Sequence, residues 1–116
     1  MESYMVEVKA MLERSVPGGR IAFLGHMGDG NLHVAIGAGG DREAVEQCVY
    51  EPLRAVGGSV SAEHGIGLEK KPWLDVTRGP NEIAMMKQLK QLFDPNNILN
   101  RGKIFDLPSA KRDLRQ

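Results

Sequence analysis

Two of the three histidines in this 116-residue chain flank a glycine-rich stretch, and the third follows a glutamate further along. The first stretch is His26-Met-Gly-Asp-Gly-Asn-Leu-His33, and the second is Ser61-Ala-Glu-His-Gly-Ile-Gly67. Imidazole nitrogens bind divalent metals, and an imidazole titrates close enough to neutral pH to act as a general base. The sequence therefore raises the question of whether His26, His33 and His64 belong to one site.

His26 and His33 can bind one metal ion if the stretch between them forms a tight turn. The short apolar segments on both sides of it predict a β-hairpin, in which directly facing residues have Cβ atoms about 5 Å apart. Zinc accepts two imidazoles and a carboxylate and then keeps a position open for substrate or water. Glu63 is the preferred third ligand, and Asp29 is weaker because an aspartate at the tip of a turn commonly caps its own loop.

A purely structural role for these residues stays open on spacing alone. A strand histidine is commonly a hydrogen-bonded, half-buried residue, and Gly-Asp-Gly-Asn is an ordinary hairpin turn. The glycines at positions 25, 28 and 30 do not match a dinucleotide-binding fingerprint, because their spacing differs and no helix follows them. Cys48 falls on the inward face of a predicted helix, where a thiol commonly packs as a small apolar residue.

The elements that must position these residues follow from apolar spacing and turn residues. Helices are expected over residues 2–14, from an N-cap at Asp41 to Gly57, and over 80–93, and strands over 21–26, 32–37 and 59–62. Pro52 removes a backbone donor and is expected to kink the second helix or restart it.

The last predicted helix carries an apolar stripe and is expected to end at Asp94-Pro95. Its inward residues are expected to be Ile83, Met86, Leu89 and Phe93. The order of elements favours the α+β class, with a small antiparallel sheet, helices packed on one face and the opposite face free. One domain is expected over residues 1–107, followed by a loose polar tail over 108–116.

Composition limits the partners of this chain. Fifteen basic and fifteen acidic residues cancel, so no net charge recruits nucleic acid or an anionic membrane surface. No apolar run reaches the roughly 18 residues of a membrane span, and one cysteine cannot form an internal disulfide. The first residues have neither the basic nor the apolar region of a secretory signal. These observations predict a cytoplasmic protein.

Three stretches together resemble the C-terminal domain of FAD-linked oxidases, the family of D-lactate, D-2-hydroxyglutarate and glycolate dehydrogenases. They run from Gly25 to His33, from Ser61 to Gly67, and from Leu92 to Ile104, the last reading Leu-Phe-Asp-Pro-Asn-Asn-Ile-Leu-Asn-Arg-Gly-Lys-Ile. Their order and spacing also match. The resemblance implies the C-terminal portion of a ferredoxin-like cap and the oxidation of a 2-hydroxy acid to the 2-oxo acid, with hydride transfer to FAD.

The resemblance also implies roles for individual residues. His26, His33 and Glu63 would bind a divalent metal, assigned as zinc, and His64 would be the catalytic base near the substrate and the flavin. Asn100 would lie near the flavin, so that Asn100, Glu63 and His64 form the cofactor-facing set. Two positions depart from the family pattern. Arg101 replaces a proline, and Ala35 replaces a substrate-contacting asparagine, which weakens an assignment to 2-hydroxyglutarate.

Members of this family run to several hundred residues, with a flavin-binding domain upstream, so the chain resembles the C-terminal portion of an enzyme. The expected partners are a small 2-hydroxy acid, an electron-accepting protein or quinone, and a second copy in a homodimer. The isolated chain is expected to be inactive, because it has no glycine-rich phosphate cradle of the right spacing. The alternative is a metal-binding or subunit-contact module without redox activity.

Overall fold

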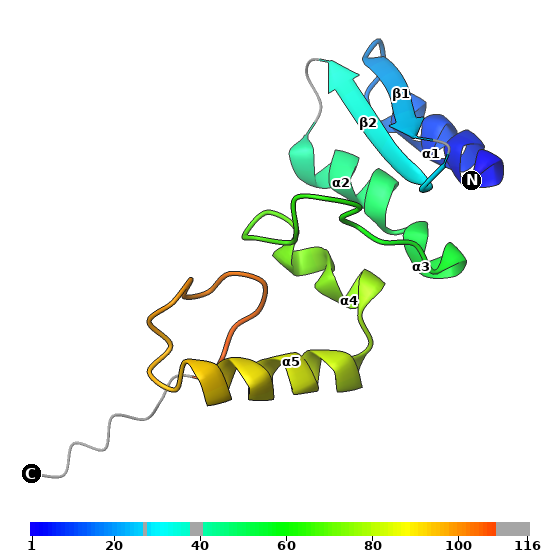
Figure 1. Cartoon of the computed structure of the whole chain (residues 1–116). Coiled ribbons are helices and arrows are strands. Elements are labelled where there is room, and N and C mark those ends of the chain that lie inside the picture. The colour runs from blue at the N-terminus through cyan, green and yellow to red at the C-terminus, as the bar shows by residue number, and fades with distance from the viewer. Residues whose placement is uncertain (27, 38–40, 109–116) are drawn as a thin grey trace, which may run out of the picture.

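The structure, a computed structural model, describes residues 1–26, 28–37 and 41–108. Its elements are α1 (Glu2–Ser15), β1 (Arg20–His26), β2 (Asn31–Gly37), α2 (Arg42–Tyr50), α3 (Leu53–Val56), η1 (Lys71–Trp73), α4 (Leu74–Thr77) and α5 (Pro80–Phe93). Figure 1 shows α1 and α2 beside the β1–β2 hairpin, while α4 and α5 lie progressively farther from it. The α+β class with an antiparallel sheet is confirmed.

The hydrophobic core lies between α1, α2 and one face of the hairpin. α1 buries Val8 and Leu12, both 0% exposed, because its apolar residues recur at helical spacing. The hairpin residues packed against this cluster are Ile21, Phe23, Leu32, Val34 and Ile36. Cys48 of α2 is buried among them as predicted, with its thiol 3.2 Å from the Ser15 hydroxyl.

The two hairpin strands pair from Arg20 opposite Gly37 to His26 opposite Asn31. Side chains alternate between the faces of a strand. The inner face is partly buried against the helices, whereas the outer residues of β1 and most of those of β2 are exposed. The predicted helices on one face and free opposite face therefore describe this part of the chain.

Local residues set the boundaries of α2 and α3 as predicted. The Asp41 side chain accepts a hydrogen bond from the Glu43 amide at 3.2 Å and caps the N-terminus of α2. Pro52 separates the two helices because it supplies no backbone donor. Gly57 ends α3 with a φ of 65°, a left-handed conformation that glycine adopts without steric cost.

The predicted third strand over residues 59–62 is wrong. Among the described residues the sheet has two strands, and this segment is irregular. Side chains take the hydrogen bonds that a strand partner would make: the Val60 amide donates to Thr77 Oγ1 at 3.0 Å and the Ser61 amide donates to Ser59 Oγ at 3.2 Å. Serine and threonine hydroxyls compete with sheet pairing in this way.

α5 has the predicted bounds, but none of the four residues predicted to point inward is buried. Ile83 and Met86 are half-buried, whereas Leu89 and Phe93 are 48% and 79% exposed. Figure 1 shows the reason, since α5 lies apart from the hairpin and from α1. The apolar residues of α5 do recur at helical spacing, but no other element within the described residues packs over them.

The described part of the chain is elongated. Its principal extents are 62, 31 and 21 Å, and its radius of gyration is 17.8 Å, against about 13 Å for a compact domain of this length. None of the helices in the described ranges has the length and apolar character needed to cross a membrane. Residues 109–116 of the predicted tail lie outside the described residues.

Candidate active site

His26 and His33 lie on the outer face of the hairpin, near the turn. They are not directly opposite each other as expected, because the register pairs His26 with Asn31 and His33 with Leu24. The two histidines are instead diagonal neighbours on one face, a relation that still allows long or aromatic side chains to meet. Their ring centroids are 6.3 Å apart and the ring planes form an angle of 83°.

Asp29 has the turn-capping role that made it the weaker ligand candidate. Its Oδ1 accepts a hydrogen bond from the backbone amide of Asn31 at 3.0 Å, across the turn. This bond uses the carboxylate within its own loop, as is common for aspartates in turns. The loop residue Met27 lies outside the described residues.

Glu63 lies next to two of the three histidines. Its Oε1 is 3.3 Å from Nε2 of His33 and 3.5 Å from Nε2 of His64. All three side chains are substantially exposed, and that of His64 is 82% exposed. Ion pairing at such exposed positions adds little stability, so these contacts matter for arrangement more than for folding. One carboxylate therefore joins His33 of the hairpin to His64.

The backbone at His64 explains how Glu63 and His64 reach each other. Adjacent residues of an extended segment point to opposite sides, so the chain must bend if Glu63 and His64 are to meet. The bend begins at His64, which has a φ of 64° and is followed by Gly65 with a φ of 74°. Histidine is among the residue types enriched in this left-handed region.

His26, His33 and Glu63 have the donor types of a zinc site, but the three side chains are not gathered around one point. Two imidazoles and a carboxylate are a common zinc ligand set. Nevertheless, in the described ranges no three His, Cys, Asp or Glu side chains are gathered as a group that could hold a metal ion. Glu63 contacts His33, whereas His26 meets the cluster only through the ring of His33. The residues fit the metal in kind, and His26 is the member that would have to move.

The third signature stretch meets the second through a backbone hydrogen bond. The amide of Ile104 donates to the Gly67 carbonyl at 2.7 Å. Asn100 lies in this loop with a φ of 47°, is exposed, and accepts a hydrogen bond from Lys103 Nζ at 3.2 Å. All three signature stretches are thus connected, the first to the second by His33 and Glu63 and the second to the third by this bond.

A buried carboxylate organises the start of the same loop. Asp94 is 5% exposed and accepts hydrogen bonds from the amides of Ile98 at 3.0 Å and Leu99 at 2.9 Å. Lys90 Nζ also donates to it. The hydrogen bond from Lys90, followed by the two backbone amides, lowers the pKa of Asp94 to about 2.

Sequence reasoning missed two adjacent lysines that hold these loops. Lys70 Nζ donates to the hydroxyl of Ser61 at 3.1 Å. Lys71 Nζ donates to the Gly102 carbonyl at 2.9 Å and to Asp106 Oδ1 at 2.7 Å. The sequence feature that could have indicated this role is the position of the two lysines, directly before Pro72 and a short distance after the second signature stretch.

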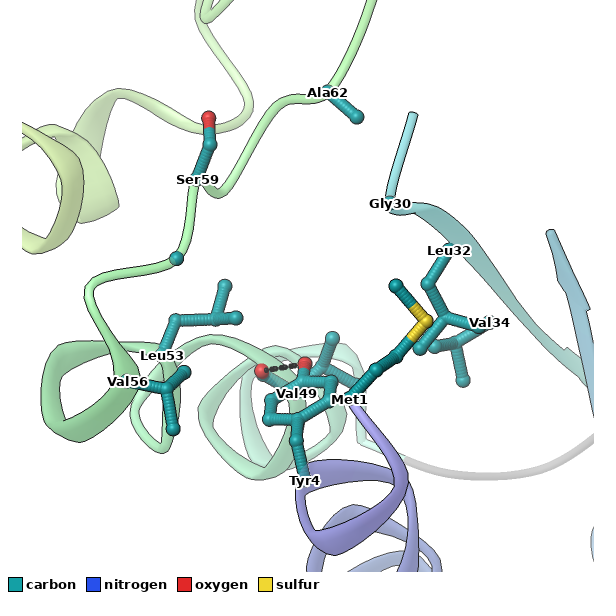
Figure 2. Close-up of a pocket in the computed structure, with 11 residues that line it drawn as sticks. Met1, Tyr4, Gly30, Leu32, Val34, Val49, Leu53, Val56, Ser59 and Ala62 are labelled. Atoms are coloured by element: carbon teal, nitrogen blue, oxygen red, sulfur yellow. Dashed lines mark hydrogen bonds between the residues drawn. The ribbon is translucent and has the colours of Figure 1, made fainter. Parts of the chain in front are cut away.

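An apolar hollow of about 300 Å³ lies between the start of α1, β2 and residues 58–62, the segment that leads to Glu63. Figure 2 shows Leu32 and Val34 on one side and Leu53 and Val56 on another, with Ala62 at the rim. The Tyr4 hydroxyl donates to the Val49 carbonyl at 2.6 Å, and burial, with a smaller contribution from Tyr50, raises the pKa of Tyr4 to about 12. The chemistry-bearing side chains lie outside this hollow.

Residues 1–104 match the family described as FAD linked oxidases, C-terminal domain. The chain belongs to this family. Among its FAD-linked oxidase relatives, D-2-hydroxyglutarate dehydrogenase of Stutzerimonas stutzeri (strain A1501) is 39% identical over 112 residues, which cover 89% of this chain and 24% of that enzyme.

Relatives with other named activities match this chain at similar identity. Glycolate oxidase subunit GlcD of Bacillus subtilis (strain 168) is 41% identical over 99 residues, covering 79% of this chain and 21% of that protein. D-lactate dehydrogenase of Anaerostipes hadrus is 40% identical over 94 residues, covering 73% of this chain and 20% of that enzyme. The chain thus spans a quarter or less of the length of these relatives.

Proposed function

We propose that this chain is the C-terminal, substrate-facing part of a flavin-dependent dehydrogenase that oxidises a D-2-hydroxy acid to the 2-oxo acid. The relatives named as D-2-hydroxyglutarate dehydrogenase, D-lactate dehydrogenase and glycolate oxidase support this reaction class. The observation that carries the proposal is the position of Glu63, whose carboxylate contacts both His33 and His64.

His26, His33 and Glu63 are the residues that would hold a divalent metal, zinc in the proposal. When bound, such an ion supplies Lewis-acid polarisation of a substrate oxygen. The hairpin supplies two imidazoles from one face, and the turn after residue 62 supplies the carboxylate. Closing the site requires the His26 ring, which now packs edge to face with the His33 ring, to move beside Glu63.

His64 is the proposed general base. Its Nε2 lies 3.5 Å from Glu63 Oε1 and the side chain is 82% exposed, so the imidazole can meet a substrate that approaches from outside this chain. A neutral imidazole can accept the proton of a 2-hydroxyl group near neutral pH. Glu63 then accepts a hydrogen bond from the protonated ring and holds its orientation.

FAD would be bound mainly by a polypeptide part that this chain does not supply, and when bound it accepts the hydride. Asn100 is the proposed flavin-side residue of this chain. It is exposed on a loop that the Ile104–Gly67 hydrogen bond ties to the His64 turn. The proposed electron acceptor of such an enzyme is a protein or a quinone.

Ala35 bears on the choice of substrate. It lies two residues from His33 on the outer face of β2 and pairs with Ala22, so two methyl groups flank the histidines there. A methyl group offers no hydrogen bond to a second carboxylate. We therefore propose a small 2-hydroxy acid such as D-lactate ahead of D-2-hydroxyglutarate.

A chimera tests the redox proposal. This chain replaces the matching 24% of the Stutzerimonas stutzeri enzyme, and the purified chimera is assayed for flavin content and for dye reduction with D-lactate and D-2-hydroxyglutarate. We expect bound flavin and turnover with a D-2-hydroxy acid, and a fall in kcat of about 100-fold in His64→Ala, as for loss of a general base. A chimera that holds flavin stoichiometrically and oxidises neither acid contradicts the proposal.

Zinc titration of the present chain tests the metal ligands separately. Wild type should bind one zinc ion, and His26→Ala, His33→Ala and Glu63→Gln should each weaken binding, while Glu13→Gln in α1 serves as the control. Equal zinc binding in all of these proteins would exclude the proposed ligand set.

A second candidate function is a subunit-contact module without redox activity, and the exposed apolar side of α5 favours it. The two candidates differ in one cheap measurement. A module of this kind leaves the chimera without dye reduction although it holds flavin, whereas the dehydrogenase part restores dye reduction with a D-2-hydroxy acid.

A further inference from the structure

The turn that carries Glu63 and His64 has a backbone that requires support. His64 and Gly65 have φ angles of 64° and 74°, so two consecutive residues adopt the left-handed conformation. This region is unfavourable for a residue with a Cβ, and it persists only where the surroundings hold it. A hydroxyl and an ammonium group make hydrogen bonds at this turn.

Ser61 lies at the centre of the turn. Its hydroxyl is within hydrogen-bond distance of the Glu63 carbonyl and 2.7 Å from the Gly65 carbonyl. Lys70 Nζ donates to the same hydroxyl oxygen at 3.1 Å. Because a hydroxyl has one proton and two lone pairs, the lysine occupies an acceptor position and leaves the proton for the carbonyls on either side of His64.

The backbone and the side chain of Lys70 are themselves held in place. Its amide donates to the Ile66 carbonyl at 3.2 Å, and its half-buried side chain borders a hollow that His33 and Glu46 also line. Trp73, which follows, donates from Nε1 to Glu46 Oε2 at 3.2 Å and so ties this segment to α2. The segment that carries the Lys70 ammonium group is therefore attached to the packed part of the molecule.

We propose that Ser61 and Lys70 are positioning residues for the candidate active site. Together they hold the left-handed turn at His64 and Gly65 and thereby keep the Glu63 carboxylate against His33. The role of these residues in holding the turn follows from their hydrogen bonds. The consequence for metal binding rests on the proposed function. Neither residue touches the reacting atoms in this scheme.

Two readouts on the present chain test the proposal. In metal-free protein, nuclear Overhauser contacts between the His33 ring and the Glu63 side chain report the turn directly. Zinc affinity, measured against a competing chelator, reports its consequence. The variants are Lys70→Met, which keeps the aliphatic stem, and Ser61→Ala, with Ser61→Thr as the rescue that restores the hydroxyl. Lys9→Met and Ser3→Ala, both in α1, are the matched controls.

We expect Lys70→Met and Ser61→Ala to lose the His33–Glu63 contact and to bind zinc about 10- to 100-fold more weakly, the range for residues that orient metal ligands. Resonances of Val8 and Leu12 should not move, which separates the effect from unfolding. Ser61→Thr and both controls should behave as wild type.

Unchanged His33–Glu63 contacts in both loss variants would overturn the proposal. If wild type itself binds no zinc, the metal part of the proposed function fails, and the contacts in metal-free protein still decide the role of Ser61 and Lys70. If the contacts are lost while zinc affinity is unchanged, the positioning role for the metal site is overturned.

Discussion

The two ends of this molecule are stabilised in different ways. Residues 1–58 enclose a core in which Val8 and Leu12 are fully buried beneath the hairpin. Residues 79–107 form α5 and a loop with no buried apolar residue, held instead by the hydrogen bonds of Asp94. The first region carries its own hydrophobic stabilisation, whereas the second has a defined local structure and an apolar surface for something else to cover.

Leu12→Ala should have the largest effect on stability. The substitution empties a fully buried position, so we expect the free energy of unfolding to fall by about 2–5 kcal/mol. Leu92→Ala on α5, a leucine that is largely exposed, is the matched control and should change it by less than about 0.5 kcal/mol. Urea unfolding followed by circular dichroism measures both. Equal losses would show that the two regions share one core.

Asp94→Asn should disrupt the second region without affecting the first. The ionised carboxylate accepts three hydrogen bonds, and its pKa of about 2 lies below the ordinary 3.8. Its stabilisation is therefore complete above pH 4 and lost as the pH falls through 2. Amide chemical shifts of Ile98 and Leu99 should move over that range in wild type.

In Asp94→Asn these two shifts should already be displaced at pH 7 and should no longer titrate. Asp75→Asn, a change of the same type on α4, should leave them as in wild type. A titration of Ile98 and Leu99 that persists in Asp94→Asn would contradict the assignment.

Tyr4→Phe should have a moderate effect on the first region. It removes the hydrogen bond to Val49 and should cost about 1 kcal/mol at pH 7. The pKa of Tyr4 is raised to about 12, so the stabilisation is complete below pH 10 and lost as the pH rises through 12. Wild type should therefore lose more stability than Tyr4→Phe between pH 9 and pH 11. The opposite order in thermal unfolding would exclude Tyr4 as the titrating group.

Leu92→Lys should have the smallest effect on stability and an effect on association. The residue is 73% exposed on α5, so we expect a change in unfolding free energy within about 0.5 kcal/mol. Removing apolar surface should lower the binding of a hydrophobic dye and any self-association in sedimentation. Gln91→Lys adds the same charge on the neighbouring position, and an equal fall in dye binding there would mean that charge alone is responsible.

Local sequence signals predicted the boundaries of several elements closely. Asp41, Pro52 and Gly57 each act on the backbone beside them, through a cap, a missing donor and a left-handed φ. Asp94 and Pro95 likewise follow the last residue of α5. Such signals need no knowledge of distant residues, which is why they were sufficient.

The errors came from features that depend on distant or competing partners. Residues 59–62 alternate as a strand would, but Thr77 and Ser59 supply the hydrogen bonds. The apolar stripe of α5 predicted a buried side, and nothing in one sequence could show that the described residues leave this side uncovered. In the site, the residue types of His26, His33 and Glu63 predicted that they lie close together. The register of the hairpin and the left-handed backbone at His64 could be seen only in the three-dimensional structure.

The left-handed backbone at His64 limits which residues can replace it. With a φ of 64°, position 64 suits glycine, asparagine and aspartate, and a β-branched side chain would be strained there. If His64 is the proposed base, tolerance to substitution at this position is restricted twice, once by the need for the imidazole and once by the backbone conformation. Asparagine is the substitution that separates the two requirements, because it preserves the turn and removes the proposed base. A library of the chimera varied at position 64 should therefore accumulate folded but inactive members with glycine, asparagine or aspartate there.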